Sequence, residues 1–438
     1  MNAGVDAFVL EPKAMSRGAL LVGGLLVTAC SMPAYVKTAY YGDLPTLKGE
    51  IGAAAASGKI TESAVVDLAE AVARREVRSA RGDDALSRVQ GARSCVNAVE
   101  RELRERADAA DDAGALAMLV LADAGKMGRD SLVQKYEGSS SGALRAVAAR
   151  GTGSPRYASL RRRFYVDPDE RVRREALRAA ADAADPSELD AVVEAARLDP
   201  DPFCRTLATR ATGRIGGVRA ALALTDLWAN ADDTVRIAIV DAWAMPSVLA
   251  NGGRASLVEL AESLDSMASI AAAGALLRAG GDTVAVGRAV LARAIREGTS
   301  EERVAAIALA PVGDADVVTA LDVAAGADDP DVRIAALVRS LDVPARRAAA
   351  LGKLQTTARG KDAAARQARL ALAAAQDASV APLLEQDLAQ GGPAFRERAA
   401  IALFRLGKPG KMAPSLADPD PSVRMAIACS LAGDRGPT

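Results

Sequence analysis

Basic and aromatic side chains gather in one short stretch of the chain, Arg161-Arg162-Arg163-Phe164-Tyr165. Guanidinium groups pair with phosphate and carboxylate oxygens, so this cluster could bind acidic lipid headgroups, an anionic glycan or nucleic acid. The same residues would also suit the end of a helix, where cations complement the helix dipole while Phe164 and Tyr165 pack inward. Both interpretations stay open, and all five residues are candidate binding residues.

The chain has only two tryptophans, Trp228 and Trp243, and they lie in one repeat unit and its neighbour. Tryptophan is enriched at interaction hot spots. In a chain that is rich in alanine, a ring of this size also serves to fill space between helices. We therefore treat Trp228 and Trp243 as candidate binding residues, with gap filling as the alternative.

Histidine is absent from the sequence. Its absence excludes Ser-His-Asp and Cys-His catalysis, histidine metal ligands and histidine acid–base chemistry. The charge is balanced, with 55 basic and 56 acidic residues and a net charge of −1, so no global field attracts nucleic acid. We predict no catalytic residue, no metal site, no cofactor, no small-molecule substrate and no nucleic-acid partner, and we expect that the chain is not an enzyme.

Three cysteines, Cys95, Cys204 and Cys429, lie far apart in helical, largely apolar contexts. Their spacing does not match a cysteine metal site, and three cysteines cannot all be paired with one another. We expect them to be small buried residues.

The stretch Ala327 to Asp342 shows how the chain builds its elements. Asp329 can cap a helix through its carboxylate, and Pro330 suits the first helical position because it has no N–H to satisfy. Apolar residues then recur at helical spacing. Arg333 follows the cap by four positions, and this arrangement recurs along the chain.

Alignment on the caps predicts units of 28 to 34 residues. The expected caps are Asp112, Ser141, Asp169, Asp201, Asp232, Ser266, Ser300, Asp329, Asp362, Gly392 and Asp420. An arginine follows most of them by four positions: Arg145, Arg173, Arg205, Arg236, Arg333, Arg366, Arg396 and Arg424. Leu116, Ile270 and Val304 break this pattern. A second amphipathic helix follows in most units, and two helices per short period predict an all-α solenoid.

The recurring aspartates and arginines form an expected ladder: Asp169, Arg173, Asp201, Arg205, Asp232, Arg236, Asp329, Arg333, Asp420 and Arg424. A row of guanidiniums could face an anionic partner. Alternatively, arginine and aspartate could pair within and between adjacent units, because a planar guanidinium binds carboxylates with two parallel hydrogen bonds. We favour this structural role.

The phrases D-P-D-E-R-V-R-R-E-A-L, D-D-P-D-V-R-I-A-A-L and D-P-D-P-S-V-R-M-A-I resemble the short HEAT-like repeats of bacterial scaffold proteins. The resemblance covers roughly Asp112 to the C-terminus and implies a right-handed α-solenoid of stacked helical hairpins. It also implies a concave binding surface made by the second helices, including Leu189 to Arg197, Leu222 to Trp228 and Leu257 to Leu264. Some HEAT-like arrays are enzymes, such as those that attach chromophores to proteins.

A different signal lies near the N-terminus. Residues 1–14 carry acidic residues where an export signal has positive charge. We interpret them as an extension that results from a wrongly assigned start, with Met15 as the true start. Residues 15–29 have a basic start, an apolar run too short to span a bilayer and small residues before Cys30. The sequence Leu26-Val27-Thr28-Ala29-Cys30 resembles the lipobox of bacterial lipoproteins. That resemblance implies cleavage before Cys30 and lipid attachment to it, and Ser31 favours the outer membrane.

The predicted organisation follows from these signals. Residues 30–60 are a lipid-anchored tether and cap helix, 61–110 an N-terminal helical segment, and 111–438 the HEAT-like array. We predict a scaffold in the cell envelope, anchored in the outer membrane and facing the periplasm, that binds an unidentified protein partner. The alternatives are a cytoplasmic HEAT-like scaffold and a HEAT-like enzyme such as a chromophore-attachment lyase.

Overall fold

The computed structural model describes residues 32–79, 86–89, 93–109, 111–263 and 267–432. The chain divides into two units, Met1–Pro33 and Ala34–Thr438, and only residues 32 and 33 of the first are described. Cys30 and the rest of the lipobox therefore lie outside the described residues. Within these ranges every regular element is a helix, which confirms the predicted all-α class. No described helix is both long enough and apolar enough to cross a membrane.

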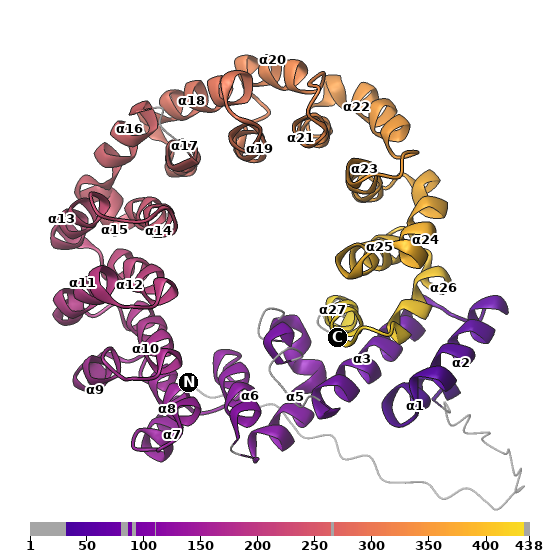
Figure 1. Ribbon diagram of the computed structural model, residues 1–438, viewed down its shortest axis with the longest axis horizontal. Helices are drawn as coiled ribbons and strands as arrows, with labels where there is room; N and C mark the ends of the chain where they lie inside the picture. Colours follow the sequence, from indigo (N-terminus) through magenta and orange to yellow (C-terminus); the bar gives the residue numbers. More distant parts are fainter. Residues whose placement is uncertain (1–31, 80–85, 90–92, 110, 264–266, 433–438) are drawn as a thin grey trace, which may run out of the picture. The chain divides into compact units, whose positions relative to one another are not determined.

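The second unit begins with helices that precede the regular array (Figure 1). Those with described bounds are α1 (Ala34–Tyr41), α2 (Leu44–Ala56), α3 (Glu62–Ser79) and α5 (Arg93–Ala107). Helix α3 packs against α1 and α5, and α5 packs against α6 (Asp112–Asp123), where the array starts.

The array alternates first and second helices, as the repeat predicts. The first helices after α6 are α8 (Gly142–Gly151), α10 (Glu170–Ala183), α12 (Pro202–Ile215), α14 (Asp233–Trp243), α17 (Met267–Ala279), α19 (Ser300–Leu309), α21 (Pro330–Ser340), α23 (Ala363–Ala374), α25 (Pro393–Arg405) and α27 (Pro421–Ala432). The second helices are α7 (Arg129–Tyr136), α9 (Ala158–Phe164), α11 (Leu189–Leu198), α13 (Gly217–Trp228), α16 (Arg254–Ser263), α18 (Val284–Glu297), α20 (Ala315–Ala324), α22 (Pro344–Thr357) and α24 (Ala381–Gln390). Short helices complete the connections: α15 (Pro246–Val248), α26 (Pro409–Met412), and the single turns η1 (Pro155–Tyr157), η2 (Pro186–Glu188), η3 (Leu249–Gly253), η4 (Gly281–Thr283), η5 (Ala378–Val380) and η6 (Ala413–Ala417).

Side-chain caps start the first helices, because the first N–H groups of a helix have no partner within it. Ser141 and four aspartates cap as predicted, accepting from backbone N–H groups of the first turn: Asp169, Asp201, Asp232 and Asp329. Asp362 does the same for α23, and Gly392 is the cap of α25. Asp420 accepts from the amide of Ser422.

Two predicted caps are wrong by one residue. Helix α6 is capped by Asp111 rather than Asp112, and α19 by Thr299 rather than Ser300. Thr299 is the cap because it forms a reciprocal capping box with Glu302. The Thr299 hydroxyl accepts the Glu302 backbone N–H, and the Glu302 carboxylate accepts the Thr299 backbone N–H. With this cap, the arginine slot of the unit falls on Arg303, so Val304 is not an exception to the ladder. The predicted cap Ser266 lies outside the described residues.

The first helices lie on the inner side of the curved array, and the second helices lie on its outer side (Figure 1). Successive first helices contact one another directly, as α10, α12 and α14 do. The expectation that second helices such as α11, α13 and α16 form the concave surface is therefore wrong. Most buried residues of the first helices α12 and α17 are small, which lets neighbouring helices approach closely.

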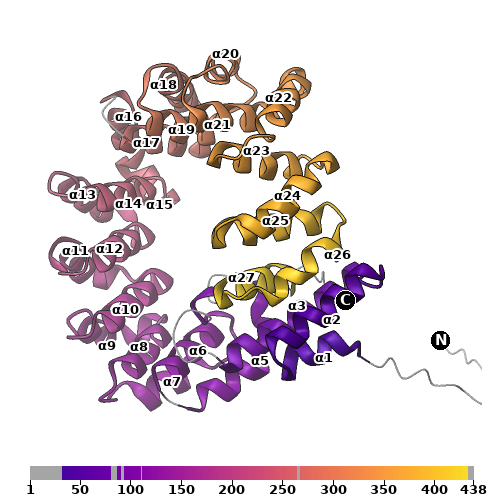
Figure 2. The same cartoon turned by 45° about the vertical axis from the view of Figure 1, so that its right-hand side comes forward.

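The last helix returns to the beginning of the unit. Helix α27 packs against α3 and α5, and it lies beside α3 in both views (Figure 1 and Figure 2). A disulfide joins Cys95 of α5 to Cys429 of α27, across 334 residues of sequence. Cys95 and Cys429 are buried, as expected, but the sequence analysis did not predict that the closure would pair them. Cys204 is buried and free, as expected.

Candidate functional site

The ladder arginines bind carboxylates of the following loop in several units. Arg145 donates to Asp167 with two hydrogen bonds of 2.9 and 2.8 Å, and Arg173 donates to Asp199 in the same way at 2.9 and 3.1 Å. Arg396 pairs with Asp418 at 2.8 and 2.9 Å. Each of these acids lies two residues before the next cap. The structure therefore uses the arginines to join units, through acids that the sequence alignment did not single out.

Each of these loop acids also accepts the backbone N–H of the cap residue that follows it, at 2.9 Å in all three loops. Burial raises the pKa of Asp167, but hydrogen bonds from Arg145 and from the Asp169 amide outweigh it, so this pKa is lowered. The carboxylate is thus held ionised between two units. Such a pair joins neighbouring units, and its charges are already satisfied by each other.

Three ladder arginines have other acceptors. Arg205 donates directly to the next cap, Asp232, at 2.8 Å. Arg333 donates to the carbonyls of Ala327 and Asp328 in its own loop. Arg424 of the last unit binds Glu76 of α3 at 2.8 and 3.0 Å. Glu76 supplies the carboxylate that a following repeat would supply elsewhere.

The basic and aromatic cluster divides into buried and exposed residues. Arg161, Phe164 and Tyr165 are buried, whereas Arg162 and Arg163 are exposed. The Arg161 guanidinium is fully buried and pairs with Glu188. The cluster is therefore not a continuous binding surface: Arg161, Phe164 and Tyr165 belong to the core. A binding role for Arg162 and Arg163 stays a prediction.

Glu188 is the centre of a small buried network. It accepts from Arg161 and, at 2.9 Å, from the Tyr165 hydroxyl. Burial, followed by the charge of Glu188, raises the pKa of Tyr165, which keeps this hydroxyl protonated as a donor. Arg161 also donates to the carbonyls of Thr152 and Ser154. The network fastens α9 to the loops on both sides of it.

Trp228 and Trp243 come together, with ring centroids 5.3 Å apart. The Arg236 guanidinium lies over the Trp228 ring, 5.4 Å from its centroid. These residues line a pocket of about 420 Å³ between α13, α14 and α16. The two predicted tryptophans therefore share one site, and Arg236 belongs to it.

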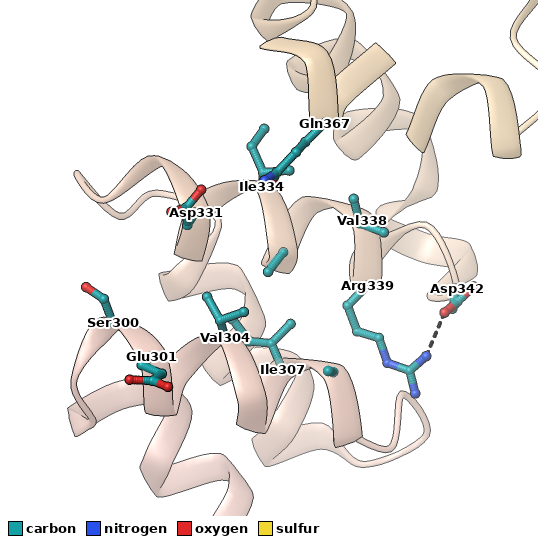
Figure 3. Close-up of a pocket in the computed structure, with 12 residues that line it drawn as sticks. Ser300, Glu301, Val304, Ile307, Asp331, Ile334, Val338, Arg339, Asp342 and Gln367 are labelled. Atoms are coloured by element: carbon teal, nitrogen blue, oxygen red, sulfur yellow. Dashed lines mark hydrogen bonds and ion pairs between the residues drawn. The ribbon is translucent and has the colours of Figure 1, made fainter. Parts of the chain in front are cut away.

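An apolar groove lies on the inner helices α19, α21 and α23 (Figure 3). Its volume is about 790 Å³, within the usual range of ligand and peptide pockets. Its apolar wall consists of Val304, Ile307, Ala308, Ile334, Ala335 and Val338. Val338 is 38% exposed, whereas Ile307 and Ile334 are buried, so the wall reaches solvent at Val338.

Acidic residues surround this wall. Glu301, Asp331 and Asp342 line the groove and are exposed. Its one basic residue, Arg339, donates to Asp342 at 2.8 Å and also to the Ala310 carbonyl. The groove therefore combines its apolar wall with negative charge on Glu301 and Asp331 that no basic residue of the groove balances. The sequence analysis did not single out this groove, because its wall forms only where α19, α21 and α23 stack.

The described residues contain no group of three or more cysteines or acids that could hold a metal ion. The polar residues that line the groove are the three acids, the paired Arg339, Ser300 and Gln367. This arrangement suits recognition of a partner surface.

The fold and the ladder define the class of this protein: an α-solenoid built from HEAT-like repeats. In agreement, a family model described as HEAT repeats matches residues 129–211 and 158–244. These segments include the loops that carry the pairs of Arg145 and Arg173. A comparison with curated proteins finds no match.

Two solved structures are similar to parts of this chain. One is an engineered protein of 21% identity, which covers 76% of this chain and 98% of its own, with a TM-score of 0.28. The other is YIBA of E. coli, with 14% identity, 66% of this chain and 95% of its own, and a TM-score of 0.30.

Proposed function

We propose that this protein is a non-enzymatic, lipid-anchored scaffold of the cell envelope that binds a protein partner in the groove between α19 and α21. The observation that carries this proposal is the apolar wall of the groove, on which Val338 is exposed to solvent. An apolar wall of this size gains free energy when a partner covers it.

The charge of the groove defines the partner's chemistry. Glu301 and Asp331 are exposed and carry no ion pair with any described residue, and Arg339 is neutralised by Asp342. The occupant is an amphipathic segment of another protein, with branched apolar side chains that cover Val304 and Val338 and with lysine or arginine at its margins. Such a segment lies in a helical groove through its apolar face.

A photoreactive residue in place of Val338 tests this site. It should crosslink one defined envelope protein in intact cells, through a segment with basic residues beside apolar ones. Val323 is the matched control position, because it is also an exposed valine (58%) but lies on the outer helix α20. Equal capture at both positions, or an acidic crosslinked segment, would contradict the proposal.

Charge reversal tests the same groove independently. Glu301→Lys with Asp331→Lys should abolish the crosslink from position 338 without lowering thermal stability, because both side chains are exposed. The matched control reverses two exposed acids on outer helices, Glu194→Lys and Asp316→Lys, and should leave the crosslink intact.

The membrane anchor rests on the lipobox that ends at Cys30. The disulfide between Cys95 and Cys429 supports an exported location, since disulfides persist mainly in oxidising compartments. Labelling cells with a lipid precursor should tag the wild type and not Cys30→Ser. Fractionation should place the wild type with the outer membrane. Recovery of the unlabelled wild type in the cytoplasm would favour a cytoplasmic scaffold instead.

A further inference from the structure

Lysines gather on the first helices that follow Cys30 in the sequence. Of the ten lysines of the chain, five lie on α1, α2 and α26 or within three residues of them: Lys37, Lys48, Lys59, Lys408 and Lys411. Helix α2 packs against both α1 and α26, and the three helices lie together at the outer edge of the second unit (Figure 1 and Figure 2). We call these five residues the lysine corner. All five are exposed, and only Lys411 forms an ion pair with a described residue, Glu385 at 3.0 Å.

The lysine corner is positively charged, although the whole chain has a net charge of −1. Residues 34–59 and 408–412 contain the five lysines, no arginine and only two acidic residues, Asp43 and Glu50, so their net charge is +3. The arginines of the array, in contrast, pair with carboxylates that join neighbouring units. Exposed lysines without such partners attract anionic surfaces, and clusters of four to eight basic residues bind acidic lipid headgroups.

Helix α1 adds an exposed aromatic residue to this charge. Lys37 and Tyr41 are four residues apart, which places them on one face of the helix, and Ala34 lies on the same face. All three residues are exposed, and Tyr41 is exposed by 74%, whereas the opposite face of α1 is buried. Tyrosine and lysine are both favoured at the boundary between water and lipid, because each has an apolar body and a polar end.

Tyr40 gives this exposed ring a fixed neighbour. The Tyr40 hydroxyl donates to Glu102 at 2.9 Å, and the Arg78 guanidinium lies over the Tyr40 ring, 3.8 Å from its centroid. The rings of Tyr40 and Tyr41 meet edge to face, with 4.4 Å between their centroids. Tyr41 therefore packs on a ring that is held in place, while most of its own surface stays in solvent.

The short connection to Cys30 favours a lipid surface over an acidic protein as the partner. Cys30 is four residues before Ala34, and four residues extend at most about 14 Å. In the proposed function Cys30 carries the lipid, so α1 begins within this distance of the membrane surface. A tether this short holds the lysine corner beside the headgroups, and opposite charges attract over about 8 Å at physiological salt.

We propose that the lysine corner and Tyr41 bind an anionic lipid surface, so that the protein docks on the membrane through α1. This inference rests on the lipid anchor of the proposed function and adds a requirement for acidic headgroups. Lys37 and Tyr41 contact the headgroups directly, and the lysines of α2 and α26 add to the attraction. Helices α19 and α21 lie across the array from α1 (Figure 1), so docking leaves their groove open to its partner.

An environment-sensitive fluorescent amino acid in place of Tyr41 reports this contact in the lipidated protein. Its emission should shift to the blue on vesicles of equal parts phosphatidylglycerol and phosphatidylcholine. It should not shift on vesicles of phosphatidylcholine alone, although the lipid attaches the protein to both. Salt at about 1 M, which shortens the Debye length to about 3 Å, should reverse the shift without releasing the protein. The matched control places the same amino acid at Leu222, which is also exposed (63%) but lies on α13, and should show no shift.

Charge reversal assigns the shift to the lysine corner. Lys37→Glu with Lys48→Glu should lower the ratio of docked to undocked protein by about tenfold or more, because each basic residue beside an anionic surface contributes about fivefold. Attachment through the lipid should be unchanged. The matched control, Lys353→Glu with Lys361→Glu, reverses two exposed lysines on α22 and in the loop after it, and should leave the shift as in the wild type. Equal shifts in the two double variants would overturn the proposal.

The two kinds of vesicle also separate this inference from the anchor on which it rests. Attachment to both vesicles with no shift on phosphatidylglycerol, or with equal shifts on both, would overturn the docking face and leave the anchor intact. Attachment to neither would contradict the anchor, and the docking face with it. Attachment to both, with a shift that needs phosphatidylglycerol and is reversed by salt, is the expected result.

Discussion

Arg161 has a different role from the one its position in a run of arginines suggests. Its side chain is fully buried and pairs with Glu188, while the neighbouring Arg162 is exposed and donates to the Ser187 carbonyl. Sequence reasoning could identify the cluster and its two possible roles. It could not separate the three arginines, because their burial depends on Glu188, which lies on the far side of a loop.

At this scale we predict a large cost for removing Arg161. Arg161→Met should lower the free energy of unfolding by about 3–5 kcal/mol, because Glu188 is left buried and unpaired. Arg162→Ala, the matched control, should change it by less than about 0.5 kcal/mol. Urea denaturation measures both. The double variant Arg161→Met with Glu188→Met should recover much of the loss, and equal losses in the two single variants would contradict a buried pair.

Asp201 both caps α12 and joins it to the preceding first helix. It accepts from the Phe203 and Cys204 amides of α12 and, at 2.7 Å, from Arg174 of the preceding first helix. The hydrogen bond from Arg174 is the largest effect on its pKa, which falls to about 2 from an ordinary 3.8. Because the folded pKa is depressed, the stabilisation is fully present above pH 3.8 and is lost as the pH falls through about 2.

Asp201→Asn should keep the cap, since asparagine caps as well as aspartate, but lose the ionic bond to Arg174. We expect the free energy of unfolding to fall by about 1–2 kcal/mol at pH 7. This difference from the wild type should shrink as the pH falls from 4 towards 2. Chemical denaturation across this range measures it. The control Asp190→Asn, whose pair with Arg219 is exposed on both sides, should match the wild type at every pH. A loss that does not depend on pH would exclude the ionic contribution.

The sequence was sufficient to predict the helices and most of their caps, because capping and amphipathic spacing are local properties. Asp329, Pro330 and Arg333 predict α21 correctly. The acceptors of the ladder were not predictable in the same way. Asp167, Asp199 and Asp418 belong to connecting loops, and they become partners of arginine only when two units stack.

Closure of the array is a property of the whole second unit. Three contacts close the array: α27 packs on α3, Arg424 pairs with the buried Glu76, and a disulfide joins Cys95 to Cys429. These residues are separated by most of the chain, and no local pattern connects them. The sequence therefore predicted repeats without predicting where the last of them would pack.

We expect the disulfide to contribute strongly to stability. It closes a loop of 334 residues, for which chain entropy gives on the order of 5 kcal/mol as an upper value. Cys429→Ala should therefore lower the unfolding midpoint markedly, and Cys204→Ala, which removes the free buried cysteine, should lower it less. Mass spectrometry without reducing agent should recover the Cys95 and Cys429 peptides linked. Recovery of both only as free thiols from oxidised protein would contradict the closure.

Deletion of residues 418–438 removes the closing helix α27. It should uncover apolar faces of both α25 and α3, because α27 packs against both, and solubility should fall. Deletion of residues 1–14, the matched control, should leave solubility unchanged. Sedimentation of the expressed proteins measures the difference, and equal behaviour of the two truncations would contradict the role of α27.

An open solenoid can lengthen during evolution, because a duplicated repeat simply extends one end. A closed one has no such end. An added unit here would separate Arg424 from Glu76 and Cys429 from Cys95 unless every joint between neighbouring units changed its angle slightly. The bonds from α27 to α3 and α5 therefore fix the number of repeats, and they make whole-repeat duplication far more destabilising than substitutions within a repeat.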